Sequence, residues 1–292
     1  MKKIDIIAAC SDLGLHVDGS KLGPEILINN LNKKKNINKI KKIKNNDSYT
    51  KDLDKNNKKK NLSEIDLFNN KLYNEINHTL KNNCFPITIG GDHSIAIASA
   101  LASINNYNNL GIIWFDAHGD FNTFETTTSG NIHGLPFAVV TGYEKNSLSD
   151  FHNGNYFNYK NAVLLGARDI DEPHELNNLK DAGVTIITTE DIKKYGAKAM
   201  YEKAFSIASN GTNGIHISYD IDCIDCDIAP GVSFPVKNGI NLNDAYAFID
   251  YIIQNKEKIK SFDLVEFNPL KDNEKTTEKI AINILNKLID NF

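Results

Sequence analysis

The sequence predicts an α/β fold in which helices surround a mostly parallel β-sheet. Short segments rich in β-branched and aromatic residues alternate with longer segments of helical periodicity along the whole chain. Several of the short segments are almost continuously apolar, as expected for strands that are covered on both faces. With 292 residues, the chain is long enough to bury a substantial core.

Seven strands and six helices follow from this pattern. The expected strands, in chain order, cover residues 4–8, 85–89, 110–115, 162–166, 184–187, 214–219 and 260–266. The expected helices cover about 63–82, 94–105, 173–182, 191–209, 243–256 and 273–291. Ser63, Asp191 and Asn243 have side chains suited to cap the N-termini of three of these helices.

We expect a single domain spanning residues 1–292, because no stretch has the composition of a linker between two domains. Segment 29–61 is rich in Asn and Lys, and its lysines far outnumber its acids. Such a run can contact nucleic acid, but this one contains no arginine and few aromatic residues. We expect a solvated surface segment, and Ile37, Ile40 and Ile43 suggest that an edge strand or a helix passes through it.

The composition narrows the class of partner and the compartment. A net charge of −4 argues against a general nucleic-acid binder and favours a small-molecule substrate. No apolar run approaches the length of a membrane span, and the N-terminus turns polar too early for a secretory signal. Four cysteines in a chain of this length do not form a disulfide framework, so the cytoplasm is the expected compartment. Cys223 and Cys226 have the spacing of a zinc-binding pair, but without a second pair two small loop residues are the simpler interpretation.

Three short motifs place acids and histidines directly after apolar runs. The motifs are GGDHS at 90–94, DAHGD at 116–120 and SYDID at 218–222. In an extended backbone alternate residues point to the same side, so Asp116, His118 and Asp120 should converge. The carboxyl ends of parallel strands meet at one edge of a sheet, where binding sites form. The side chains expected at this edge are His93, Asp116, His118, Asp120, Asp220 and Asp222.

The charge of this group predicts a pair of divalent metal ions. One ion would offset half of the charge of four carboxylates, and two ions would offset all of it. Two ions about 3.5–4 Å apart with bridging carboxylates form a common hydrolytic site. Oxygen-rich ligation with two imidazoles and no thiolate favours manganese, with cobalt, iron or zinc as alternatives. Alternatively, these residues could be surface acids in unrelated loops. That interpretation is reasonable for one such motif but not for three motifs that all follow predicted strands.

At these residues the sequence resembles the ureohydrolases, the arginase and agmatinase family, over nearly its whole length. The motifs GGDHS, DAHGDFN, TTTSGNIHG, SYDID and VEFNP stand in the family's order and approximate spacing. The resemblance implies one three-layer α/β/α domain with a sheet of about eight strands, assembled as a trimer or hexamer. It also implies that a hydroxide bridging two manganese ions attacks the guanidinium carbon. One ion would be held by His93, Asp116, Asp120 and Asp220, and the other by Asp116, His118, Asp220 and Asp222.

Within the family, the resemblance is closest to arginases, which hydrolyse L-arginine to L-ornithine and urea. Arginases have Asn at the position of Asn122, and they share the Ser-Gly-Asn-x-His-Gly element that covers 129–134. The resemblance implies that Asn122, Ser129 and Asn131 bind the substrate α-carboxylate through hydrogen bonds, some of them through water. The α-amino group would be bound by Asp171, with Glu175 as a further candidate.

The same resemblance assigns roles to three ionisable residues. His133 would protonate the leaving amine, Asp120 would orient the nucleophile and take its proton, and Glu266 would face the guanidinium. Without the motifs, His133 would be interpreted as a hydrogen-bonded loop histidine and Glu266 as a buried structural acid. The histidines with no assigned catalytic role are His16, His78, His152, His174 and His216.

Two positions depart from the family pattern and leave the substrate open. Arginases commonly carry Glu where this chain has His174, so either Glu175 replaces it through a small loop shift or α-amino recognition is weaker. APGVSFP at 229–235 stands where arginases and agmatinases usually have Gly-Thr-Gly-Thr-Pro. Its Gly-Val-Ser is similar to formimidoylglutamases, and Phe234 would reshape the guanidinium pocket. The alternatives are hydrolysis of formimidoylglutamate or another guanidino acid, and a family member without catalytic activity.

Overall fold

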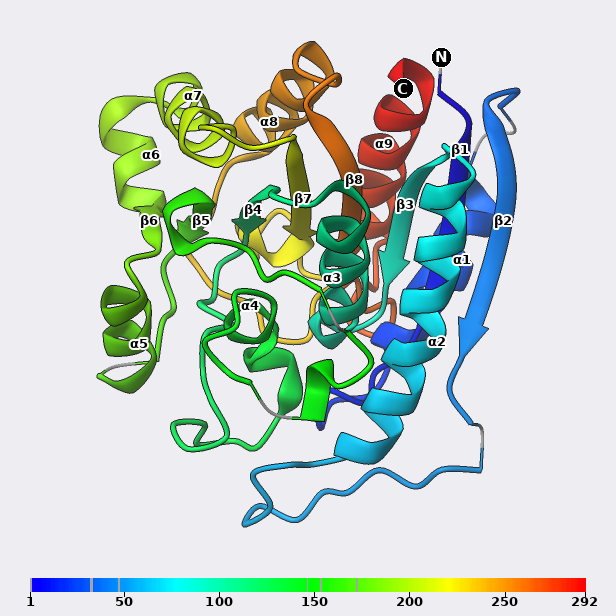
Figure 1. Ribbon diagram of the computed structural model, residues 1–292, viewed down its shortest axis with the longest axis vertical. Coiled ribbons are helices and arrows are strands. Elements are labelled where there is room, and N and C mark those ends of the chain that lie inside the picture. The colour runs from blue at the N-terminus through cyan, green and yellow to red at the C-terminus, as the bar shows by residue number, and fades with distance from the viewer. Residues whose placement is uncertain (1, 32–33, 47, 146, 153, 172) are drawn as a thin grey trace.

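The structure is a computed structural model that describes residues 2–31, 34–46, 48–145, 147–152, 154–171 and 173–292. In this part of the chain, eight strands form one sheet in the order β2-β1-β3-β8-β7-β4-β5-β6, and all neighbouring strands are parallel (Figure 1). The strands are β1 (Ile4–Cys10), β2 (Ile37–Lys44), β3 (Phe85–Gly90), β4 (Gly111–Phe115), β5 (Ala162–Ala167), β6 (Thr185–Thr188), β7 (Ile215–Asp220) and β8 (Ile259–Val265). The predicted fold class is confirmed.

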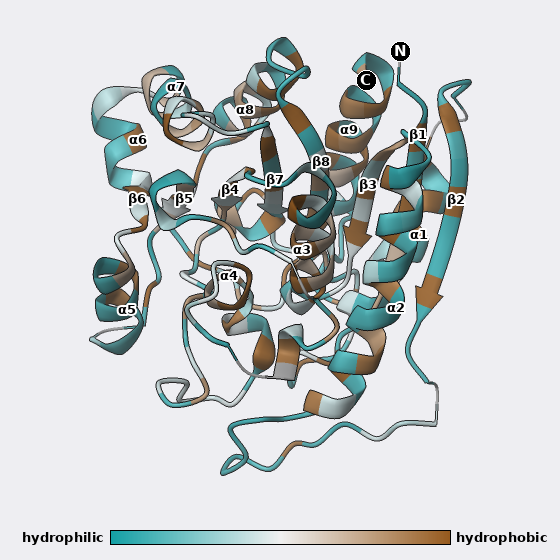
Figure 2. Ribbon diagram, in the orientation of Figure 1, coloured by the Kyte–Doolittle hydropathy of each residue, from teal (hydrophilic) through white to brown (hydrophobic). Residues whose placement is uncertain are grey.

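Helices cover both faces of the sheet and give the molecule three layers. One hydrophobic cluster joins the sheet to α1, α6, α7, α8 and α9, and a second joins its other face to α2, α3, α4 and α5. These helices are α1 (Gly23–Asn30), α2 (Leu62–Lys81), α3 (Ala96–Tyr107), α4 (Pro136–Val140), α5 (His174–Ala182), α6 (Thr189–Tyr195), α7 (Ala197–Ala208), α8 (Leu242–Gln254) and α9 (Thr276–Asn291). The central strands are hydrophobic, as two covered faces require (Figure 2). Among the described helices, none combines the length and apolar character needed to cross a membrane.

The strand order determines where the candidate site lies. The chain passes from β3 to β4 across two positions that β7 and β8 later occupy, so β3, β8, β7 and β4 are neighbours in the middle of the sheet. Because the strands are parallel, their carboxyl ends open on the same edge. The three acidic motifs and Glu266 follow these four ends.

Several helices differ from the prediction. The expected helix at 191–209 is divided into α6 and α7, because Gly196 has a φ of +89° that a continuous helix does not allow. The short helices α1 and α4 were not expected, and each begins with a proline in its first turn. Both helices are short, and a helical periodicity becomes visible in a sequence only over several turns.

The helix N-caps were predicted two to three residues too late. The observed N-caps are Thr188, Asn241 and Asn61, where we expected Asp191, Asn243 and Ser63. Thr188 and Asp191 form a capping box, in which each side chain accepts the backbone N–H of the other residue. The expected cap at α6 is therefore the third residue of the helix and the second partner in the capping box.

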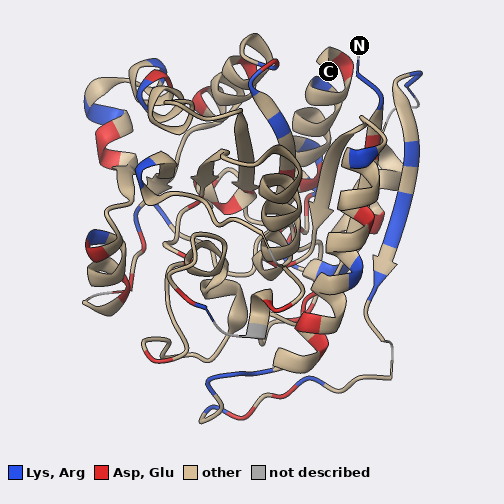
Figure 3. Cartoon of the chain, viewed as in Figure 1, with Lys and Arg blue, Asp and Glu red and all other residues tan. Residues whose placement is uncertain are grey.

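The Asn/Lys-rich segment is more than a solvated insertion. Its isoleucines and lysines form β2, an edge strand that pairs with β1 and carries the lysines seen in Figure 3. The Asn/Lys-rich segment continues after β2 and ends at Lys60 and Asn61, which are both buried. The expectation of a solvated segment is therefore wrong for this end. Residues 32, 33 and 47 of the segment lie outside the described residues.

Candidate active site

Four of the predicted metal ligands form a first cluster around the imidazole of His93. Its Nδ1 lies 3.0 Å from carboxylate oxygens of Asp116 and Asp120 and 3.2 Å from a carboxylate oxygen of Asp220. These residues follow β3 and β4 or end β7, so the neighbouring strand ends bring them together. His93, Asp116 and Asp220 can offer one ligand atom each within 4.8 Å of one another.

The remaining predicted ligands form a second cluster around His118. Its Nδ1 lies 3.0 Å from Oδ2 of Asp222 and 3.4 Å from Oδ1 of Asp116. Asp116 directs its other oxygen, Oδ2, to His93 in the first cluster. A carboxylate shared in this way is suited to bridge two cations.

The backbone is strained at two candidate residues. Asp120 has a φ of +49°, so the extended alternation that we predicted from β4 onwards stops before this residue. Glu266, directly after β8, has a φ of +67°. Non-glycine residues in the left-handed region cost free energy and concentrate at functional sites. The approach of Asp120 to His93 therefore depends on a backbone turn and not on continued strand geometry.

Both clusters carry an excess of negative charge. Four carboxylates face two imidazoles, and all of these side chains except His118 are buried. Burial by itself would lower the pKa of His93, but Asp120, Asp116 and Asp220 raise it well above its ordinary value. Burial, followed by the charge of Asp116, raises the pKa of Asp120 to about 6. Acids packed this closely resist simultaneous ionisation unless cations join them.

The donor atoms of the first cluster fit a metal ion. Nδ1 of His93 and Oδ2 of Asp120 are buried and have no hydrogen-bond partner among the described residues. Polar atoms without partners are costly in a protein interior. A nitrogen surrounded by carboxylate oxygens is the donor set of a divalent transition metal.

Trp114 and Ser218 hold His93 from two sides. The indole of Trp114 stacks on the imidazole, with 4.2 Å between ring centroids and 9° between planes. Its Nε1–H donates to Oδ2 of Asp116 at 3.1 Å. Nε2 of His93 lies 2.9 Å from Oγ of Ser218, which leaves Nδ1 directed at the carboxylates. Neither residue was predicted as part of the site from the sequence, although Trp114 is the only tryptophan of the chain.

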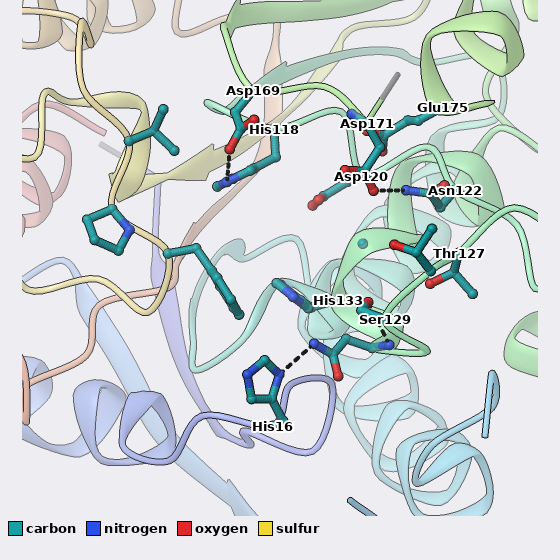
Figure 4. A pocket seen from close by; sticks show the side chains of 16 residues that line it. His16, His118, Asp120, Asn122, Thr127, Ser129, His133, Asp169, Asp171 and Glu175 are labelled. Atoms are coloured by element: carbon teal, nitrogen blue, oxygen red, sulfur yellow. Dashed lines mark hydrogen bonds and ion pairs between the residues drawn. The ribbon is translucent and has the colours of Figure 1, made fainter. Parts of the chain in front are cut away.

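A cavity of about 390 Å³ adjoins the second cluster (Figure 4). His118 and Asp120 line it, which places one ligand of each cluster at its surface. The predicted residues that also line it are Asn122, Ser129, Asn131, His133, Asp171 and Glu175. Glu266 is buried and is not among the residues that line the cavity.

His133 lies between Glu266 and Phe234. Its Nδ1 is 3.4 Å from Oε1 of Glu266, and the same oxygen accepts the backbone N–H of His93 at 2.8 Å. Burial by itself would lower the pKa of His133, but Glu266 and Asp120 raise it. On the other side, the imidazole stacks on Phe234 with 5.1 Å between centroids and 20° between planes. Phe234 therefore forms a wall of the cavity and supports His133.

Asp171 and Glu175 face the cavity at the start of α5. Nδ2 of Asn122 donates to Oδ2 of Asp171 at 3.3 Å. The two carboxylate oxygens of Glu175 accept the backbone N–H groups of Phe121 and Asp171 at 2.8 and 2.9 Å. Burial raises the pKa of Glu175 to about 8. His174 is exposed and does not line the cavity, so Glu175 is the residue that reaches it.

Several residues that line the cavity were not predicted as site residues from the sequence, among them His16, Asp169 and Thr127. Nδ1 of His16, which follows β1, lies 2.9 Å from Nδ2 of Asn131. Asp169 lies 3.8 Å from Nε2 of His118, and Thr127 belongs to the TTTSGNIHG motif. The motif was a usable signal for Thr127. His16 carries no local pattern, because only the fold brings its loop to the cavity.

Comparisons with known proteins agree with this geometry. A model of the arginase family matches residues 2–290. The arginase of Staphylococcus aureus strain COL is 38% identical over 227 residues, which cover 77% of this chain and 74% of that protein. The solved arginase of Bacillus caldovelox superposes with a TM-score of 0.90 at 29% identity, covering 99% of this chain and 98% of that one. The Entamoeba histolytica arginase, solved in complex with L-ornithine, superposes with a TM-score of 0.88 at 30% identity and 99% and 98% coverage.

Proposed function

The chain belongs to the arginase family and is a hydrolase of a guanidino carbon–nitrogen bond; from this premise we propose that its substrate is L-arginine, cleaved to L-ornithine and urea. One observation carries the proposal. Two acidic clusters share Asp116 and adjoin a cavity lined by Asn122, Ser129 and Asn131. The L-ornithine complex of the related Entamoeba histolytica arginase supports the same product.

Two divalent ions are the proposed cofactor, and manganese suits the oxygen-rich donors best. His93, Asp116, Asp120 and Asp220 would hold one ion. Asp116, His118, Asp220 and Asp222 would hold the other. When bound, the ions lower the pKa of a coordinated water towards neutrality and so supply a nucleophile without a strong base.

The protein's own groups position the substrate and move the protons. Asp120, at the cavity surface, would orient the attacking water and accept its proton. Nδ1 of His133 faces Glu266, so Nε2 is the ring atom left to protonate the departing amine. Glu266 would supply the negative charge for the guanidinium group. Asn122, Ser129 and Asn131 would bind the α-carboxylate, and Asp171 and Glu175 the α-amino group.

The test is to load the purified protein with Mn²⁺ and measure urea and formamide separately with L-arginine. We expect urea, with ornithine in equal amount. Absence of urea at millimolar L-arginine, with both metals present by elemental analysis, would reject L-arginine as the substrate. His133→Asn should lower kcat by about 10²-fold or more, as loss of a general acid does. An unchanged kcat would show that His133 is not the general acid, and absence of turnover of every substrate would favour a family member without catalytic activity.

Phe234 favours one second candidate, hydrolysis of formimidoylglutamate. It stands in the Gly-Val-Ser-Phe-Pro stretch that departs from the arginase pattern, and its ring forms a wall of the cavity. The same assay distinguishes the two substrates, because formimidoylglutamate releases formamide. Agmatine, guanidinobutyrate and guanidinopropionate complete the panel.

We also propose a cytoplasmic homo-oligomer, either a trimer or a hexamer. The four cysteines are unpaired, as in a reducing compartment. Size-exclusion chromatography with light-scattering detection measures the mass of the oligomer, and a monomer would contradict the proposed assembly.

A further inference from the structure

The end of the Asn/Lys-rich segment packs against the loop that carries Ser129. Nζ of Lys58 donates to the carbonyl oxygen of Glu125 at 2.6 Å. Nζ of Lys60 donates to the carbonyl oxygen of Ser129. Two lysines of one segment therefore reach the backbone of the loop whose side chains line the substrate cavity.

Lys60 is buried to a degree that is rare for lysine, with 6% of the residue exposed. Removing an ammonium group from water is costly, so buried lysines usually have an acidic partner. Lys60 forms no ion pair with any carboxylate of the described residues, and its hydrogen bond goes to Ser129. A hydrogen bond from the backbone N–H of Asp54 is the main cause of the lowered pKa of Asp52. The charge of Lys60 also contributes to this lowered pKa, but no ion pair joins Lys60 to Asp52. The oxygens of Asp52 already accept N–H groups from Asp54 and Asn57. The ammonium group of Lys60 therefore lies behind Ser129, with the carbonyl oxygen of Ser129 as its acceptor.

This charge lies where two cavities meet. A second cavity of about 410 Å³ is lined by His16, Leu53, Lys55, Lys60, Thr128 and Ser129. His16, Thr128 and Ser129 also line the substrate cavity, and Figure 4 shows His16 and Ser129 at its edge. None of the described residues that line the second cavity is acidic, and two are lysines. The described residues that line this second cavity therefore contribute positive charge and no negative charge beside Ser129.

We propose that Lys60 is a specificity-determining residue that favours substrates with a carboxylate at the Ser129 end of the cavity. The inference rests on the proposed function, in which Asn122, Ser129 and Asn131 bind the α-carboxylate. These three residues are neutral donors, so none of them supplies a charge. An ammonium group held away from bulk water attracts a carboxylate more strongly than a hydrated surface lysine does. Lys60 also fixes the peptide of Ser129, and so the donor side chain, in place.

L-arginine and agmatine test this inference, because they differ only in the α-carboxylate. We would measure kcat and KM for both with the manganese-loaded wild type, Lys60→Met and Lys60→Arg. For arginine, Lys60→Met should lower kcat/KM about 10-fold, mainly through KM, as loss of a charge-assisted contact does. The value for agmatine should change little. Lys60→Arg retains the charge and should restore most of the arginine value.

Lys58→Met is the matched control, because exposed Lys58 also donates to a carbonyl of this loop. If Lys60 only braced the loop, Lys60→Gln, which can still donate to the carbonyl of Ser129 but carries no charge, would keep the wild-type ratio of arginine to agmatine kcat/KM, and that result would overturn the proposal. An unchanged ratio of arginine to agmatine kcat/KM in Lys60→Met would overturn it as well. Thermal unfolding identifies a variant that fails to fold, and Lys60→Gln then takes its place.

Failure of the proposed function gives a different result. A metal-loaded wild type that releases urea from neither substrate rejects arginine hydrolysis and leaves Lys60 to be tested by binding. Calorimetry with L-ornithine and putrescine, which again differ only in the carboxylate, provides that measurement. Weaker ornithine binding in Lys60→Met, with putrescine binding unchanged, supports the inference, and equal ornithine affinity in both proteins overturns it.

Discussion

Trp114 connects the aromatic core to both candidate metal clusters. Its indole stacks on His93 on one face and on Phe137 on the other, with 5.0 Å between the latter centroids. Its Nε1–H donates to Asp116, the residue that the two clusters share. One buried residue of β4 therefore orients a ligand of the first cluster and the carboxylate common to both. Such outer contacts fix the geometry of metal ligands.

Metal binding should quench the fluorescence of Trp114. Because it is the only tryptophan, its emission reports on this site alone. A paramagnetic Mn²⁺ ion held by His93 would lie one imidazole ring away from the indole. Titration of metal-free protein with Mn²⁺ should give a saturable decrease in emission, which Asp116→Ala should abolish. Two bound ions by elemental analysis, with unchanged emission, would contradict the proposed ligand set.

At the scale of elements, the loop from 122 to 131 depends on its packing against the Asn/Lys-rich segment. Gly130 has a φ of +70°, and a Cβ atom at this position would lie 2.1 Å from the carbonyl oxygen of Asn57. Two features therefore require glycine at this position, the left-handed backbone and the close approach of the Asn57 carbonyl. Since Ser129 and Asn131 flank it, its conformation sets the direction of two proposed carboxylate-binding residues.

Gly130→Ala should therefore destabilise the protein more than the left-handed backbone alone explains. The left-handed conformation should cost alanine about 1–2 kcal/mol, and the contact with Asn57 should add about 1–3 kcal/mol. Gly211→Ala is the matched control, because Gly211 also has a φ of +70° but nothing lies within 4 Å of its added Cβ. Urea unfolding compares the two variants. Equal losses of unfolding free energy would show that the segment does not constrain the loop.

Arg168, the only arginine of the chain, ties the loop after β7 to the end of β5. Its guanidinium donates to the carbonyl oxygens of Asp222 at 2.7 Å and Val236 at 3.0 Å. Further contacts reach the carbonyl oxygens of Cys223, Ile224, Lys237 and Gly166. A planar fork of five N–H donors can serve more acceptors at once than an ammonium group, which has three donors.

Arg168→Lys should lower the free energy of unfolding by about 2 kcal/mol, because several charge-assisted hydrogen bonds are lost. Metal affinity should fall as well, since Asp222 would be held less firmly. Lys193→Met removes one exposed hydrogen bond to the carbonyl of Asn238 and serves as the control, with little expected change. Urea unfolding and Mn²⁺ titration measure the two effects. Wild-type stability in Arg168→Lys would mean that the loop is held by its other contacts.

The sequence predicts the elements of this fold better than their boundaries. Seven strands were expected because uninterrupted apolar runs mark strands covered on both faces. The pattern of β2 is compatible with a strand or a helix, because its isoleucines stand three residues apart and not at alternate positions. The burial of Lys60 was not predictable, since it depends on contacts with residues about 70 positions later in the chain.

At the scale of the whole molecule, the strand order assembles the site. The motifs indicate that acids and histidines follow strands, but they do not indicate which strands are neighbours. Placement of β7 and β8 between β3 and β4 brings His93, Asp116 and Asp220 within contact distance. His16 reaches the same cavity from a loop without a local pattern, so only the assembled fold reveals it, whereas the departure of 229–235 from the family pattern already indicated Phe234.

The stability of the folded protein against acid should depend on His152, a buried residue that belongs to neither metal cluster. His152 is buried, its Nε2 lies 3.0 Å from the carbonyl oxygen of Asn155, and its Nδ1 lies 3.3 Å from the hydroxyl of Tyr73 on α2. Burial lowers its pKa in the folded state, against an unfolded value of about 6.5. Below that pH, His152 is protonated in the unfolded chain but stays neutral in the folded protein until the pH reaches its lowered pKa. His152 therefore contributes stability that is present above about pH 6.5 and is lost as the pH falls towards the lowered folded pKa.

His152→Gln should reduce this loss, because glutamine offers a donor and an acceptor but does not titrate. Urea unfolding at pH 7.5 and at pH 5.5, in the same metal-free state, gives the free energy difference for each protein. The difference should be smaller in the variant by at most about 1.4 kcal/mol per pH unit, the limit for one proton. His78→Gln, which changes an exposed histidine of α2, should keep the wild-type difference. If His152→Gln keeps it too, acid sensitivity does not originate between α2 and the loop that carries His152.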